Sequence, residues 1–204
     1  MKKAYPAIAT LEFRDIATGM YTTDVMVKEA PIAVLKCGTI SQGRYLTLIG
    51  GSTASVQASY EEGLLAGVGS IIDHTFLPDI HEDLHAAILG KRNESNGEAV
   101  GILETSTVSS NFLATEVALK HTPVSLVELR YGDSLLAGKA VSILHGVLHD
   151  VEASIRAAAE RLTSADIPVS HRILTNPDDA IYNEINQDTR FHAGKLRSLG
   201  GESV

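Results

Sequence analysis

The sequence has no tryptophan and one cysteine, and aromatic residues make up only 5% of its 204 positions. The single cysteine, Cys37, excludes an intrachain disulfide framework and is typical of a protein in a reducing compartment. No apolar run approaches the ~20 residues that a membrane-spanning helix needs. The N-terminal segment also lacks the apolar centre of a signal peptide, because charged residues interrupt it early.

Positive charge is scarce as well. Seventeen Lys and Arg residues against 25 Asp and Glu residues give a net charge of −8, which argues against nucleic acid as a partner. The rest of the composition is ordinary for a globular protein, with 44% hydrophobic and 21% charged residues. A chain of this length forms one large domain or two domains of about 100 residues.

An internal repeat favours two domains. The segment "TDVMVKEAP" (23–31) returns 92 positions later as "TEVALKHTP" (115–123). The alignment continues without a gap over 7–35 and 99–127. Three extra residues then follow in the second copy, and the register returns with Gly43 over Gly138. Matched segments in the same order indicate a tandem duplication.

Each copy predicts the element order β-α-β-β-α-β, which is that of a ferredoxin-like α+β unit. Strands are expected at 7–13, 32–37, 45–49 and 70–76, and again at 99–105, 124–129, 140–144 and 169–174. Pro31 and Pro123 end the first helix of each copy, and the second helices are expected at 54–66 and 149–163. We predict domains at 1–92 and 93–186, a polar linker at 90–98 and a loose polar tail at 187–204.

The first helix of each copy carries one apolar stripe at helical spacing. In the first copy the stripe is Ile16, Met20, Thr23 and Val27; in the second it is Val108, Phe112, Thr115 and Leu119.

These segments resemble, in order and twice over, the tandem, non-permuted shell proteins of bacterial microcompartments. The motifs are "IATLEF", "TDVMVKEAP" and "VLKCGTISQGRYLTLIGG" in the first copy, and "GILETSTVSS", "TEVALKHTP" and "GKAVSILHG" in the second. The resemblance implies a homotrimer of two BMC domains per chain, a flat pseudohexameric tile with a central pore. Such tiles pack edge to edge with other shell proteins around encapsulated enzymes in the bacterial cytoplasm. For this chain we expect no catalysis or cofactor of its own, and no nucleic-acid or membrane partner.

The resemblance also assigns residues to the pore. The loop between the second and third strands of each copy would reach the central axis. The pore-lining residues would then be Ser41, Gln42, Gly43, Asp133, Ser134, Leu135, Leu136 and Ala137. The insertion in the second loop breaks sixfold equivalence, so we expect a threefold opening. Two ordinary hairpin turns are the alternative.

Lys28 and Lys120 occupy equivalent positions near the ends of the first helices. The resemblance places them at the tile edge, in contact with the neighbouring tile. A solvated surface lysine is the alternative interpretation, and the recurrence of lysine in both copies favours the edge.

Metal binding has little support in the sequence. Cys37 is the one candidate, because a related tandem protein holds an iron–sulfur cluster with a cysteine in the first pore loop. The aligned position here is Ser41, so we interpret Cys37 as a small buried hydrophobe. The pairs His81/His85 and His145/His149 supply too few converging ligands for zinc, and solvated polar faces are favoured.

Two further hypotheses remain open at this stage. Paired ferredoxin-like domains also serve as small-molecule sensors or binding modules. A redox tile with a metal cluster at the pore is the other alternative.

Overall fold

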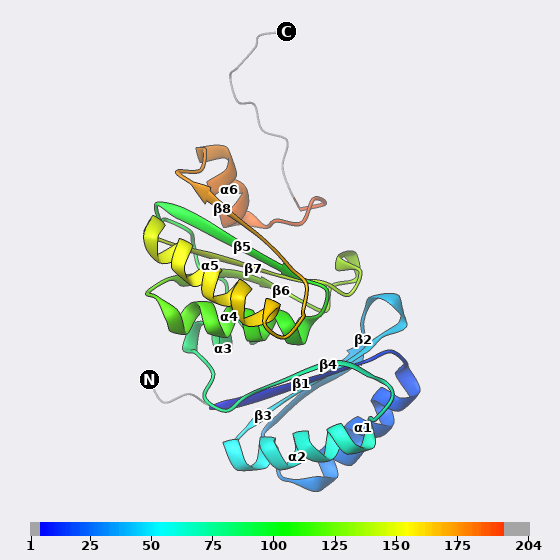
Figure 1. Cartoon of the computed structure of the whole chain (residues 1–204). Helices are drawn as coiled ribbons and strands as arrows, with labels where there is room; N and C mark the ends of the chain where they lie inside the picture. The colour runs from blue at the N-terminus through cyan, green and yellow to red at the C-terminus, as the bar shows by residue number, and fades with distance from the viewer. Residues whose placement is uncertain (1–4, 194–204) are drawn as a thin grey trace.

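The computed structural model describes residues 5–193 and folds each half of this range into the same sequence of elements (Figure 1). The first half contains β1 (Ala7–Phe13), α1 (Ile16–Glu29), β2 (Val34–Thr39), the short 3-10 turn η1 (Ser41–Gly43), β3 (Tyr45–Gly51), α2 (Thr53–Ala66), β4 (Ile71–Leu77) and α3 (Glu82–Ile88). The second contains β5 (Ala99–Thr105), α4 (Val108–His121), β6 (Ser125–Arg130), η2 (Ser134–Leu136), β7 (Ala140–Gly146), α5 (Leu148–Thr163), β8 (Val169–Thr175) and α6 (Asp179–Gln187).

The two antiparallel sheets have the same strand order, β2-β3-β1-β4 and β6-β7-β5-β8. The predicted βαββαβ order is therefore confirmed for both copies. The duplication extends to single hydrogen bonds that join the first helix to the third strand. Thr23 pairs with Thr47 in the first copy, and Thr115 pairs with Ser142 in the second, both at 2.5 Å between hydroxyl oxygens.

The two domains share a core, and α4 lies at its centre. One face of the first sheet packs on α1 and α2 through Leu11, Phe13 and Ile49. Its other face contributes Ile8 and Leu48 to a larger cluster that includes α3, α4 and α5. The remaining face of the second sheet packs against α6. Figure 1 shows the result as alternating layers, with α1 and α2 at one end of the molecule and α6 at the other.

The matched apolar stripes of α1 and α4 have different surroundings. In α4 all four stripe residues are buried, and Phe112 is 0% exposed. In α1 only Thr23 is buried, whereas Ile16, Val27 and Met20 are exposed, Met20 to 58%. The difference arises because the first domain covers α4, while nothing within residues 5–193 covers the same face of α1.

The predicted tail is partly ordered against the second domain. Residues up to Gln187 belong to α6, and Thr189 donates a hydrogen bond to Glu128 at 3.0 Å. Arg190 binds Asp133, as described below, so residues 187–190 are not a loose tail. Residues 194–204 lie outside the described range. None of the helices within 5–193 combines the length and hydropathy needed to cross a bilayer.

Candidate functional site

The two predicted pore loops lie side by side in the single chain. The hydroxyl of Ser41 in η1 donates to the backbone carbonyls of Asp133 and Ser134, at 3.0 and 3.1 Å. This contact links positions 92 and 93 residues apart in the sequence. The structure thus places the two predicted pore loops in contact within one chain.

The tips of both loops share one backbone conformation. Gln42 and Gly43 have φ angles of 66° and 70°, and the aligned Ala137 and Gly138 have φ angles of 49° and 82°. Left-handed geometry is natural for glycine but costs a residue with a Cβ about 1 kcal/mol or more. Because both copies retain it at the same aligned positions, the tip geometry belongs to the repeated unit.

Asp133 lies in the second loop, but its carboxylate points into the protein. Its Oδ1 accepts from the backbone N–H of Leu135 at 2.9 Å, and its Oδ2 accepts from Nε of Arg190 at 3.0 Å. Nη2 of Arg130 approaches the same oxygen at 3.5 Å. The Leu135 N–H and the two guanidinium groups hold the pKa of Asp133 below its ordinary value. Asp133 therefore anchors the loop rather than presenting a free acid at its tip.

The exposed part of the second tip combines the polar Ser134 with the apolar Leu135 and Ala137. Leu135 is 64% exposed, whereas Leu136 is half-buried. Gln42 and Gly43 of the first tip are exposed, so the paired tips offer an amide and backbone groups beside one leucine. Sequence analysis missed the role of Arg130 and Arg190, because no local pattern connects a residue near the C-terminus to this loop.

The two equivalent lysines differ in their partners. Lys120 pairs with Glu116 at 2.6 Å and donates to the carbonyl of Asp79, also at 2.6 Å, so it joins α4 to the first domain. Lys28 pairs with Asp24, the residue equivalent to Glu116, and its side chain is 72% exposed, against 47% for Lys120. Lys28 therefore occupies the same helical position without a second domain beside it.

Two carboxylates of the first sheet hold the N-terminus of α4 across the domain boundary. Oε1 of Glu12 accepts from the backbone N–H of Ser109 at 2.7 Å. Oδ2 of Asp73 accepts from the N–H of Ser110 at 3.0 Å and from the hydroxyl of Thr107. A helix N-terminus favours negative charge because its first N–H groups have no partner within the helix. Burial nevertheless raises the pKa of Glu12 to about 7, since its side chain is inaccessible to water.

Cys37 is exposed on β2, so its interpretation as a small buried hydrophobe is wrong. The physical reason is that β2 is an edge strand, and most of its side chains lie at the surface of the single chain. Within residues 5–193, no group of three or more His, Cys, Asp or Glu side chains is arranged to hold a metal ion.

The histidines have separate local roles. Nδ1 of His81 accepts from the backbone N–H of Asp83 at 3.2 Å and caps α3. His145 ends β7, where burial lowers its pKa, and His149 lies in α5. His145 and His149 therefore do not lie on one helix face.

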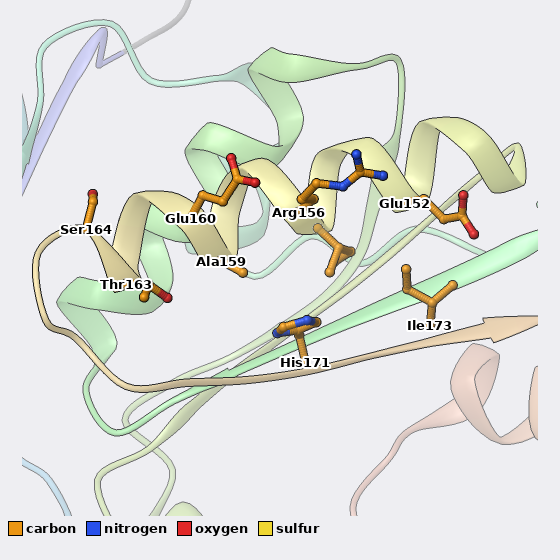
Figure 2. Close-up of a pocket in the computed structure, with 9 residues that line it drawn as sticks. Glu152, Arg156, Ala159, Glu160, Thr163, Ser164, His171 and Ile173 are labelled. Carbon is orange, nitrogen blue, oxygen red and sulfur yellow. The ribbon is translucent and has the colours of Figure 1, made fainter.

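A groove of about 640 Å³ lies between α5 and β8, and its lining includes Ile155, Ala159, His171 and Ile173 (Figure 2). In the first domain the positions equivalent to Ile155, Ala159 and Ile173 hold the larger side chains of Tyr60, Leu64 and Phe76. There Tyr60 stacks on Phe76 with ring centres 5.5 Å apart, and its hydroxyl lies 2.6 Å from Nδ1 of His74.

Comparison with known proteins supports the duplication and the fold. The family model for the BMC domain matches the chain twice, over residues 7–80 and 99–177. The bacterial microcompartment shell protein PduT of Citrobacter freundii is 29% identical over 179 residues, which cover 88% of this chain and 97% of PduT.

Two solved structures are also similar. A microcompartment protein from Desulfitobacterium hafniense is 30% identical, with a TM-score of 0.75 over 87% of this chain and 98% of its own. A fused permuted hexameric shell protein of the RMM microcompartment shares the fold, with a TM-score of 0.54 at 22% identity over 78% of this chain and 85% of its own. Because the family model covers most of both halves, the chain belongs to the bacterial microcompartment (BMC) domain family and carries two tandem copies of that domain.

Proposed function

We propose that the chain is a structural tile of a bacterial microcompartment shell, located in the bacterial cytoplasm and without catalysis of its own. Three chains close into a pseudohexameric ring of six BMC domains. The ring surrounds a central opening for a small metabolite and packs edge to edge with other shell proteins around encapsulated enzymes. The family supplies the shell role, and the geometry of α1 and α4 supports the ring.

The main support for the proposed ring is the exposed apolar stripe of α1. The chain contains one copy of a contact in which the first helix of one domain packs on the sheet of the other, with α4 against β1 and β4. The two surfaces that a second contact of this kind would need remain exposed. They are the apolar face of α1 and the part of the second sheet near β5 and β8, where Ser170 and Arg172 are exposed. Repeating the contact between chains pairs α1 with the second sheet of the next chain. This contact is head-to-tail and closes into a ring if its rotation permits.

The opening would be lined by three copies of η1 and three of η2. Gln42 and Gly43 supply polar groups, Leu135 supplies an apolar contact, and Asp133 is neutralised within each chain. Such a lining suits a small polar or uncharged passenger better than a cation, because it has no ring of free carboxylates. The longer second loop gives the opening threefold symmetry.

The ring is tested by Met20→Glu. We expect the unaltered chain to elute as a trimer in size-exclusion chromatography with light scattering, and to appear as threefold discs in negative-stain images. Met20→Glu adds a charge to the uncovered stripe and should give a monomer with an unchanged circular dichroism spectrum.

Val68→Glu is the matched control, because Val68 is another exposed apolar residue outside α1 and its replacement should leave the trimer intact. A monomeric unaltered chain, or a Met20→Glu variant that remains trimeric, would contradict the proposed ring.

A further inference from the structure

A groove of about 440 Å³ follows the seam between the two domains, beside the base of the second loop. We call it the seam groove. Its lining comes from β2, the end of α3, the end of β6 and the segment after α6. The lining residues that matter here are Lys36, Leu89, Leu129, Arg130, Tyr131 and Arg190. The side chains of Lys36, Arg130 and Arg190 are cationic, and no carboxylate is among the described residues that line the groove.

The positive charge extends beyond this groove. An adjoining hollow of about 210 Å³ shares Arg130 and Arg190 and adds Lys91 and Arg92, with Glu128 and Asp188 as its acidic residues. Five cations thus gather in one region of a chain whose net charge is −8. A concave surface of one sign concentrates ligands of the opposite sign.

The acidic residues nearby neutralise only part of this charge. Arg92 pairs with Glu128 at 3.0 Å, and Arg190 pairs with both Asp133 and Asp188 at 3.0 Å. Three carboxylates therefore face five cations. The pKa values of Asp133 and Asp188 are both lowered, with hydrogen bonds and nearby guanidinium charges among the causes.

Lys36 is paired with no carboxylate among the described residues, and Arg130, which pairs with Asp133 and donates to Thr189 through its Nη atoms, keeps an unused Nε. Nζ of Lys36 lies 5.0 Å from the ring centre of Tyr131 and 3.5 Å from its hydroxyl, a contact with an aromatic ring rather than with a carboxylate. The side chain of Arg130 is 12% exposed, and its buried Nε has no hydrogen-bond partner. Buried polar groups are normally hydrogen-bonded, and leaving a donor unpaired is costly.

The rest of the groove lining is largely apolar. Ile88 is buried, Leu89 is exposed at the end of α3, and Leu129 of β6 completes the surface. The backbone of α3 is fixed there, since the hydroxyl of Tyr131 donates to the carbonyl of Ile88 at 2.8 Å. A ligand that fills the groove therefore needs a charged head and a short apolar body.

We propose that the seam groove binds a small organic anion. A carboxylate or phosphate head lies among Lys36, Arg130 and Arg190, and a short hydrocarbon body lies against Leu89 and Leu129. Guanidinium groups match the geometry of both kinds of head, and the lysine adds a point charge. The site goes beyond the proposed tile function, because one chain supplies every residue of the groove.

The test is isothermal titration of the full chain at low ionic strength with butyl phosphate, butyrate and butylamine. We expect saturable binding of at least one of the two anions and none of the amine. The anion that binds more tightly identifies the preferred head group. Lys36→Gln should weaken that binding at least fivefold, because it removes one of three cations and disturbs no ion pair of the single chain.

Lys139→Gln is the matched control, since Lys139 is an exposed lysine that pairs with Glu104 outside the groove. It should leave the affinity unchanged. Binding of neither anion, binding of butylamine, or an equal loss in both lysine variants would overturn the proposal. Titration does not depend on ring or sheet formation, so its failure is distinguishable from failure of the tile function.

Discussion

Individual carboxylates of the first sheet bind the start of α4 and so join the two domains. Glu12 is unusual among them, because it is fully buried and its pKa is raised. Its Oε1 accepts one backbone hydrogen bond at the start of α4, but its Oε2 is buried without a partner. Desolvation raises its pKa most, and the nearby charge of Asp73 adds to this, while Arg44 and the Ser109 hydrogen bonds act in the opposite direction. The folded protein therefore retains a proton that the unfolded chain releases near its ordinary pKa of 4.5.

This difference predicts a pH-dependent loss of stability. Between the unfolded pKa of 4.5 and the folded pKa of about 7 the folded state binds more protons, so the free energy of unfolding falls as pH rises through this window. Glu12→Gln keeps an oxygen for the N–H of Ser109 and cannot ionise. We expect the variant to gain more stability at pH 8 than at pH 5, by on the order of 3 kcal/mol.

Urea unfolding of the two proteins at both pH values measures this difference. An equal effect of the substitution at pH 5 and pH 8 would show that Glu12 has the same ionisation in the folded and unfolded chains.

At the scale of elements, the sequence predicts the helices and strands themselves well. It predicts less well which of their faces are buried. Alternating apolar residues, helical spacing and the two prolines were sufficient for both βαββαβ units, because these signals are local. The stripes of α1 and α4 are equally apolar, yet only α4 is buried, since its cover comes from a sheet about 100 residues away. The exposure of Cys37 was missed for the same reason: a short apolar strand does not reveal that it lies at a sheet edge.

The groove between α5 and β8 shows how the two copies have diverged in packing. Leu64 and Ala159 are equivalent in α2 and α5, and Leu64 packs against the core of the first domain. Ala159→Leu restores the larger side chain of the first copy. We expect it to stabilise the protein by about 1 kcal/mol, because the apolar surface that it buries in an existing groove outweighs the slightly lower helix propensity of leucine.

Thermal or urea unfolding measures the gain from Ala159→Leu. Ala153→Leu, elsewhere on α5, controls for helix propensity. A destabilised Ala159→Leu variant would mean that neighbouring side chains already close the groove.

At the scale of the whole molecule, the sequence predicts those parts of the candidate site that lie within the two repeated units. The repeat identifies the two loops as equivalent, and Ser41 of the first contacts the second at Asp133 within one chain. The contribution of Arg190 was not predictable, because it lies beyond the repeated units and acts through long-range ion pairs. Those pairs give the carboxylate of Asp133, a predicted pore-lining residue, the role of anchoring the loop.

Lys28 provides the last prediction, because the chain shows what its counterpart does when another domain is present. Lys120 reaches the carbonyl of Asp79 in the adjoining domain while paired with Glu116. Lys28 has the same acidic neighbour on its helix and remains largely exposed, so its ammonium group is accessible to a neighbouring domain. Lys28→Ala removes an exposed amine and should leave both the fold and the trimer intact.

We expect Lys28→Ala to reduce the fraction of protein in sedimentable sheets at least fivefold, measured by centrifugation and negative-stain imaging at equal trimer concentration. Lys139→Ala, which removes the same charge from a lysine outside α1, should form sheets as the unaltered protein does. If Lys28→Ala trimers assemble to the same extent as the control, the lysine is a solvated surface residue. An edge contact made by its ammonium group would be lost in the variant, and sheet formation would fall. If the variant instead forms trimers but no sheets, α1 contains two distinct interfaces. Its apolar stripe then closes the ring, and Lys28 near its C-terminus joins one ring to the next.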